Sequence, residues 1–219
     1  MTDYNSPQLL QNWEQKFIEY LHDHETDDYS HDLSHFQRVW KTAQKIMAEE
    51  TRPVNALTVL AACYFHDIVT FPKNHPNRSK SSQFAAQKTA EILGELKFPA
   101  ELIENTCHAV EAHSFSANIP TRTPEAEVVQ DADRMEAIGA IGLARVFYTG
   151  GKMGSKLFHA QDPWAENREL DDKQYSVDHF FCKLLKLGET MKTAPGRKLA
   201  EENTDYLRAF LDKLREELG

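Results

Sequence analysis

The chain has 219 residues, of which 41% are hydrophobic, and a formal net charge of -9, values that fit one acidic domain with a sizeable core. The acidic balance excludes proteins whose affinity rests on neutralising the backbone of a nucleic acid polymer, and the absence of 18 consecutive apolar residues predicts no membrane-spanning helix. The first residues lack the basic and apolar regions of a signal peptide, and three widely spaced cysteines favour a reduced, cytoplasmic location.

Apolar residues recur at helical spacing along most of the chain. Ser6-Pro7 gives a cap and first-turn signal for the first helix. Residues 54–67 are almost entirely apolar and predict a buried central helix. No segment alternates apolar and polar residues between turn signals, so strands are expected to be few or absent. The predicted helices cover residues 7–24, 32–50, 54–67, 81–96, 99–113, 124–149, 176–192 and 203–218.

Three irregular segments, residues 68–80, 114–123 and 150–175, separate these helices. Each is longer than most connections in compact domains, and such loops often carry function. The sequence contains no internal repeat and no low-complexity tract. It therefore predicts an all-α fold, with one domain of about eight helices spanning residues 1–219.

The buried central helix ends in the pair His66-Asp67. A carboxylate that follows seven apolar or aromatic residues is costly to leave unpaired in a protein interior. A metal ion is one partner that would justify this arrangement. The alternative is a capping Asp next to a histidine that is hydrogen-bonded within the fold.

Other histidines and carboxylates lie in similar surroundings. His31 and His35 are four residues apart and project from one face of a helix. Asp131 and Asp133 lie within an otherwise apolar helical segment. Two imidazoles and two carboxylates form a set that suits Mn, Fe, Co, Ni, Zn or Mg. Such a site would keep positions open for a water molecule and a substrate oxygen, as hydrolysis requires.

The order of His, His-Asp and Asp on successive helices resembles the HD-domain metal-dependent phosphohydrolase superfamily. Three segments are similar to its bacterial YedJ/YpgQ-like branch: HDLSHFQRV at 31–39, AACYFHDI at 61–68 and QDADRMEAIGAIGLARVF at 130–147. The similarity extends from about residue 25 to 215 and includes DHFFCKLLKL at 178–187. The motif spacing makes this match much more specific than an isolated His-Asp pair.

The resemblance implies that His35, His66, Asp67 and Asp133 bind one divalent metal ion, with Mn or Mg favoured. Asp133 is chosen over Asp131 because the Ala-Asp-Arg step is similar to the last motif of the family. Side chains two residues apart on a helix point about 200° from each other, so one ion would bind only one of the two. The metal-binding core would cover about residues 25–150, with C-terminal helices at 176–218 packing on it.

The implied activity is metal-dependent hydrolysis of a nucleotide or a related small phosphate ester or anhydride. Nucleoside triphosphate pyrophosphohydrolysis is known in this branch. Several other branches carry a Glu soon after the His-Asp pair as a general base, whereas this chain has Ile68, Val69, Thr70 and Phe71. Asp67, a metal-bound hydroxide or His113 remain candidates for that role.

Two other function classes remain open. One is a regulatory module that binds a metal and a nucleotide without catalysis, which the missing Glu favours. The other is an iron-dependent oxygenase with two metals, a chemistry found in a minority of HD-type folds. It would require His108 or His113 as ligands of a second metal.

Several cations and one histidine are candidates for binding a phosphorylated substrate. Residues 71–82 concentrate positive charge immediately after the His-Asp pair, which suits the recruitment of phosphate to an acidic protein. Ordinary ion pairs or solvated positions are the alternatives. The expected partner is a small phosphorylated molecule, with a nucleotide favoured, and neither a nucleic acid polymer nor a membrane. The oligomeric state is left open. The candidate residues are His31, Arg38, Lys73, Arg78, Arg134 and Lys183.

Overall fold

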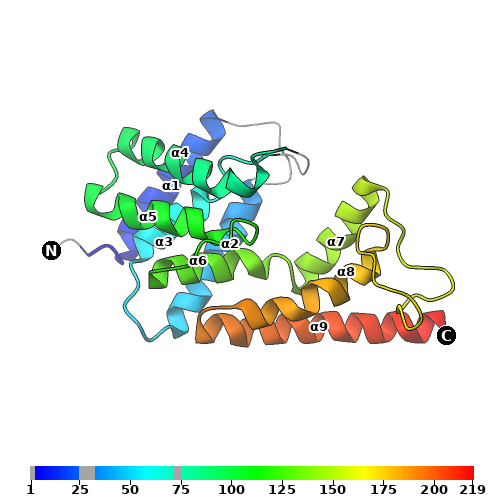
Figure 1. Cartoon of the computed structure of the whole chain (residues 1–219). Helices are drawn as coiled ribbons and strands as arrows, with labels where there is room; N and C mark the ends of the chain where they lie inside the picture. The colour runs from blue at the N-terminus through cyan, green and yellow to red at the C-terminus, as the bar shows by residue number, and fades with distance from the viewer. Residues whose placement is uncertain (1–2, 25–32, 72–74) are drawn as a thin grey trace. The chain divides into compact units, whose positions relative to one another are not determined.

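The computed structural model describes residues 3–24, 33–71 and 75–219 (Figure 1). Within these residues the chain forms nine α-helices, short 3-10 helices and one isolated β-bridge between Lys156 and Tyr175. The predicted all-α fold is confirmed. The chain divides into two compact units, which we call unit 1 (Met1–Asp133) and unit 2 (Arg134–Gly219). That the whole chain forms a single domain stays a prediction.

Unit 1 is built around its third helix. The helices here are α1 (Pro7–Asp23), α2 (Leu33–Glu49), α3 (Ala56–Phe65), α4 (Ser81–Glu95), α5 (Ala100–His113) and α6 (Pro124–Met135), and a 3-10 turn, η2 (Arg78–Lys80), precedes α4. All ten residues of α3 are buried, as its apolar sequence predicts. Asn55 caps this helix, since its side chain accepts a hydrogen bond from the backbone N–H of Thr58 at 3.0 Å.

The neighbours of α3 fix where it ends. Helices α1, α2 and α5 pack against it, and Phe17 of α1 contacts Phe65 edge to face with ring centroids 5.0 Å apart. Phe17 and Phe65 are both fully buried. The last turn of α3 is thus held on several sides, and the chain leaves it directly into His66 and Asp67.

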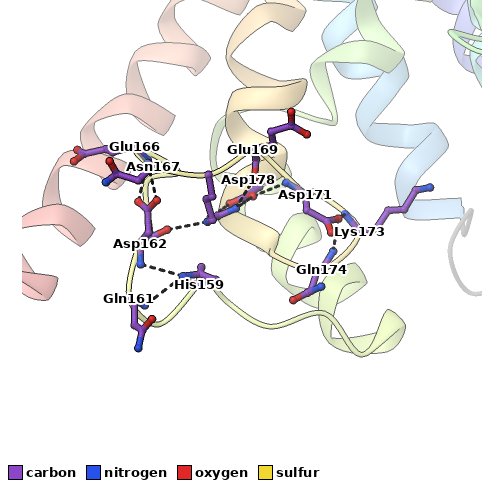
Figure 2. A network of polar contacts seen from close by, with 11 residues as sticks. His159, Gln161, Asp162, Glu166, Asn167, Glu169, Asp171, Lys173, Gln174 and Asp178 are labelled. Atoms are coloured by element: carbon purple, nitrogen blue, oxygen red, sulfur yellow. Dashed lines mark hydrogen bonds and ion pairs between the residues drawn. The ribbon is translucent and has the colours of Figure 1, made fainter.

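Unit 2 contains α7 (Gly139–Met153), α8 (Ser176–Cys182), the 3-10 helix η3 (Leu184–Thr190) and α9 (Ala194–Leu218). Between α7 and α8 lies an irregular segment, residues 154–175, with its own polar network (Figure 2). In that network the Asp162 carboxylate accepts hydrogen bonds from the backbone N–H groups of Glu166 and Asn167. The backbone of Lys156 also bonds to that of Gln174 at 2.9 Å. The irregular segment predicted over residues 150–175 is therefore confirmed from residue 154 onward, since α7 extends to Met153, and it is internally ordered.

The prediction of one helix over residues 124–149 is wrong, because α6 ends at Met135 and α7 begins at Gly139. Tight turns close α6, with the Ala137 N–H donating to the Arg134 carbonyl at 3.1 Å. Ile138 is extended, and Gly139 has a φ of +67°, a left-handed conformation that glycine adopts without strain. The break therefore ends α6 two residues after Asp133.

Two C-terminal predictions also need correction. The helix expected over residues 176–192 divides into α8 and η3, with Lys183 between them. The last helix begins at Ala194 instead of residue 203. Its start has a physical cause, since the Thr193 side chain accepts a hydrogen bond from the Gly196 N–H at 2.9 Å and Pro195 occupies the first turn.

None of the helices that the structure describes is both long enough and apolar enough to cross a membrane.

We expect Gly142→Ala to destabilise unit 2 by about 1–3 kcal/mol, because an added Cβ would lie 2.3 Å from the carbonyl carbon and oxygen of Ala137. Urea unfolding would measure this change. The matched control is Gly151→Ala in the same helix, where a Cβ meets nothing within 4 Å. That control should be neutral or slightly stabilising. Equal effects of both substitutions would contradict the steric explanation.

Candidate metal centre

Four helices of unit 1 bring three histidines and two aspartates together. His35 lies in the first turn of α2, and His66 directly follows α3 with Asp67 next to it. His113 is the last residue of α5, and Asp133 lies near the end of α6. The chain segments that carry them are far apart in sequence and meet because α2 and α5 both pack on α3.

The side chains converge through specific atoms. The Nε2 atoms of His35 and His66 are 3.1 Å apart. Asp133 Oδ1 lies 3.7 Å from the first and 3.6 Å from the second. Asp67 joins the set through both oxygens, with Oδ2 3.7 Å from His66 Nε2 and Oδ1 3.3 Å from the Nε2 of His113. The histidines are buried, whereas the Asp67 and Asp133 side chains keep exposed fractions of 20% and 25%. The centre is therefore accessible from its carboxylate side.

Backbone carbonyls orient two of the imidazoles. His66 Nδ1 lies 2.9 Å from the Cys63 carbonyl oxygen, and His113 Nδ1 lies 2.6 Å from that of Val110. A ring that donates its Nδ1–H to a carbonyl holds its Nε2 ready as a ligand, which is how metal-binding histidines are commonly fixed. Both Nε2 atoms point into the cluster.

The electrostatics of the cluster favour a cation. Burial alone would lower the pKa of His66, but the carboxylates of Asp67 and Asp133 outweigh it and raise this pKa to about 9. Burial would raise the pKa of Asp133, yet the hydrogen bond and charge of His66, together with His113 and His35, hold it well below its usual range. The two carboxylates thus stabilise positive charge here, and a metal that binds His66 must displace its proton.

These atoms fit a divalent ion. Donors that share one ion at about 2.0–2.2 Å lie about 3.0–3.5 Å from one another, close to the separations just given. Two groups of ligand atoms lie within 4.8 Å of one another and so could hold a metal ion: His35, His66 and Asp67, and His66, His113 and Asp133. His66 belongs to both groups, so one ion can draw ligands from each.

The structure separates the two candidate aspartates of α6. Asp133 faces the histidines, whereas Asp131 is fully buried and belongs to neither group of ligand atoms. Their different surroundings follow from the rotation of about 200° between positions two residues apart on a helix.

The predicted substrate-binding residues are more scattered. His31 and Lys73 lie outside the residues that the structure describes. Arg38 lies one turn after His35 and donates to the Ser34 hydroxyl at 2.9 Å. Arg78 donates to the Phe71 carbonyl at 2.8 Å.

Arg134 and Lys183 belong to unit 2. Within unit 2, Arg134 donates to the Thr190 carbonyl at 2.9 Å. Lys183 lies between α8 and η3. Neither observation bears on phosphate binding, so the two roles stay predictions.

His108 does not join the cluster. Its Nδ1 lies 3.1 Å from Glu111 Oε1, and its Nε2 accepts the Arg122 backbone N–H at 2.9 Å. Both ring nitrogens are thus engaged, Nδ1 within α5 and Nε2 with the loop that follows it. This counts against the oxygenase alternative, as far as that alternative requires His108 as the ligand of a second metal.

Gln130 is a supporting residue that motif spacing did not indicate. It is buried on α6 three residues before Asp133, hence on the same face, and its Nε2 donates to the Ala112 carbonyl at 2.6 Å. Ala112 immediately precedes His113. Gln130 therefore ties the end of α5 to the helix that carries Asp133. Its position three residues before Asp133, on the same helix face, is the sequence signal from which its supporting role could have been predicted.

We expect Gln130→Leu to weaken metal binding by up to about tenfold, the lower end of the range for outer partners of metal ligands, because Gln130 supports Asp133 only by tying α6 to the end of α5. Calorimetric titration with Mn²⁺ would measure the affinity. Gln15→Leu is the control, since Gln15 makes an exposed hydrogen bond to Glu19 on α1. Unchanged Mn²⁺ affinity in Gln130→Leu would contradict a supporting role.

Comparison with known proteins finds similarity to HD-domain proteins. A family model described as HD domain matches residues 32–138. Bacillus subtilis YpgQ is 29% identical over 224 residues, covering 100% of this chain and 96% of YpgQ. A crystal structure of an HD-superfamily hydrolase from Bacillus thuringiensis has a TM-score of 0.73 and 28% identity, covering 95% of this chain and 97% of that one. The crystal structure of YpgQ in complex with ADP has a TM-score of 0.65 and 26% identity, covering 99% and 97%.

Proposed function

We propose that the chain, whose residues 32–138 match the HD-domain family model and whose fold is similar to that of an HD-superfamily hydrolase, is a metal-dependent phosphohydrolase acting on a nucleotide, with nucleoside triphosphate pyrophosphohydrolysis as the specific reaction. The observation that carries the proposal is the convergence of His35, His66, Asp67 and Asp133 on one point beyond the end of α3. The ADP complex of a relative that matches nearly the whole chain supports a nucleotide as the substrate.

We assign the four residues as ligands of one divalent ion, with Mn²⁺ or Mg²⁺ favoured. When bound, the ion would lower the pKa of a water molecule and polarise a phosphate oxygen. His35 and His66 would supply neutral ligands, and the carboxylates of Asp67 and Asp133 would supply negative charge. The mixed nitrogen and oxygen set suits such ions.

Asp67 and His113 are the residues that we assign to proton transfer. Oδ2 of Asp67 faces His66, while its Oδ1 lies 3.3 Å from His113 Nε2. His113 holds its Nδ1 against the Val110 carbonyl, so a proton taken from water by Asp67 can be shared with His113 Nε2. This pair takes the place of the Glu that several related branches carry after the His-Asp pair.

The test is hydrolysis of a panel of nucleoside triphosphates by protein stripped with a chelator and reloaded with Mn²⁺ or Mg²⁺. Pyrophosphate and phosphate release are measured separately, since pyrophosphohydrolysis yields a nucleoside monophosphate and pyrophosphate. We expect activity only in the reloaded protein, and a loss of about 100-fold or more in His113→Gln, as for a general acid–base group. Stoichiometric metal binding without cleavage of any nucleotide would reject hydrolysis and favour the regulatory module.

A further inference from the structure

An aromatic cluster lies just beyond the metal centre along the chain. It consists of Phe71, His75 and Phe84. The rings of Phe71 and His75 stack with centroids 4.5 Å apart and planes only 7° from parallel. Phe84 meets Phe71 edge to face at 5.6 Å. The three rings thus form one contiguous cluster, in which Phe71 and His75 stack on each other and Phe84 is nearly perpendicular to Phe71.

Hydrogen bonds hold this aromatic cluster in place. Arg78 donates to the Phe71 carbonyl at 2.8 Å, and the Asn77 backbone N–H donates to His75 Nδ1 at 3.1 Å. Although fixed, the cluster is not buried: Phe84 keeps 38% of its surface exposed, and Phe71 and His75 are partly exposed. The rings are therefore preorganised yet open to a ligand.

The aromatic cluster lies at the same end of unit 1 as the metal centre. Phe71 is four residues after Asp67, and Phe84 is in the first turn of α4. A tight turn joins α4 to α5, and the two helices pack side by side in opposite directions (Figure 1). The start of α4 therefore lies next to the end of α5, where His113 is located.

We propose that Phe71, His75 and Phe84 form a stacking platform for the nucleobase of the substrate, an inference that rests on the proposed nucleotide hydrolysis. An exposed, fixed aromatic surface suits the flat face of a base, and it binds purines and pyrimidines alike because every base has a π-face. The platform therefore selects nucleotides over phosphates without a base. Arg78 acts here as a positioning residue through its bond to Phe71.

Calorimetric titration compares ADP with inorganic pyrophosphate, two diphosphates that differ by the adenosine. Wild-type protein loaded with Mn²⁺ is compared with Phe84→Leu, which keeps apolar packing against Phe71 but removes the ring. Loss of one base stack should raise the Kd for ADP about fivefold to a hundredfold and leave that for pyrophosphate unchanged. Phe84→Tyr should restore ADP binding, and Tyr206→Ala, at a 49% exposed aromatic of α9, is the control.

Unchanged ADP affinity in Phe84→Leu would overturn the platform, as would equal losses for ADP and pyrophosphate or failure of the wild type to bind ADP. The binding assay separates this inference from the proposed function. If ADP binding depends on Phe84 but the loaded wild type cleaves no nucleotide, the platform stands and hydrolysis fails. If nucleotides are cleaved while the affinity for ADP does not depend on Phe84, hydrolysis stands and the platform fails.

Discussion

Asp133→Asn is expected to abolish tight metal binding in unit 1 and to lower nucleotide hydrolysis about a thousandfold. The substitution keeps the shape of the side chain but removes the negative charge whose Oδ1 lies within 3.7 Å of both His35 and His66. Metal activation contributes several kcal/mol to the transition state, and each 1.4 kcal/mol is a factor of ten in rate. Metal content by elemental analysis and initial rates with excess Mn²⁺ would measure the two effects.

The matched control is Asp131→Asn, the same change two residues earlier on the same helix. Asp131 is fully buried outside the groups of ligand atoms, so metal content should be retained even if stability falls. Thermal unfolding of both variants separates loss of the site from loss of the fold. If Asp131→Asn loses the metal and Asp133→Asn keeps it, Asp131 is the ligand and our assignment fails.

Arg168→Ala is expected to destabilise unit 2 by about 3–5 kcal/mol, the range for removing one partner of a buried ion pair. The Arg168 guanidinium binds both carboxylate oxygens of Asp178, at 2.5 and 2.7 Å, and the Asp178 side chain is fully buried. Without Arg168, the buried Asp178 carboxylate would still accept a hydrogen bond from the Asp171 backbone N–H, at 2.7 Å (Figure 2). That bond would remain to offset the cost of burying the negative charge. Urea unfolding followed by circular dichroism would measure the loss.

Arg208→Ala provides the comparison, because Arg208 makes a single ion pair with Asp205 in which both side chains are more than half exposed. Such pairs contribute about 0–1 kcal/mol. Similar losses in the two variants would contradict a special role for the buried pair. The pH dependence has a defined sign: burial raises the Asp178 pKa, but the bonds from Arg168 and Asp171 lower it overall. The stabilisation is therefore present above the usual aspartate range and is lost as the pH falls through the lowered pKa.

The sequence predicted helices best where burial and a cap agree. The apolar run of α3 and the Asn55 cap specify one outcome, and all ten residues are buried. The break between α6 and α7 escaped prediction because the apolar residues on both sides keep helical spacing. Gly139 marks the break by its left-handed conformation, and a glycine alone is a weak sequence signal. The start of α9 was detectable from Thr193 and Pro195, but the sparse apolar residues of its first turns masked these signals.

At the site, motif spacing selected residues that the fold does bring together. Periodicity alone gives the face of a helix on which a side chain lies, as for Asp133 against Asp131, but not the partner it meets. The contact between His113 and Asp67 depends on α5 packing against α3, and Gln130 acts through a backbone carbonyl. Neither the composition nor the spacing of residues in the sequence indicates such contacts. The metal-binding roles themselves stay predictions.

Unit 1 ends at Asp133, which is also the last of its four proposed ligands along the chain. The first, His35, lies 98 residues earlier. During synthesis, a growing chain therefore carries only a partial ligand set until α6 has left the ribosome. Because metal affinity depends on a formed site, the nascent protein should capture its ion late, when unit 1 is complete, and incomplete chains should compete poorly for metal in the cell.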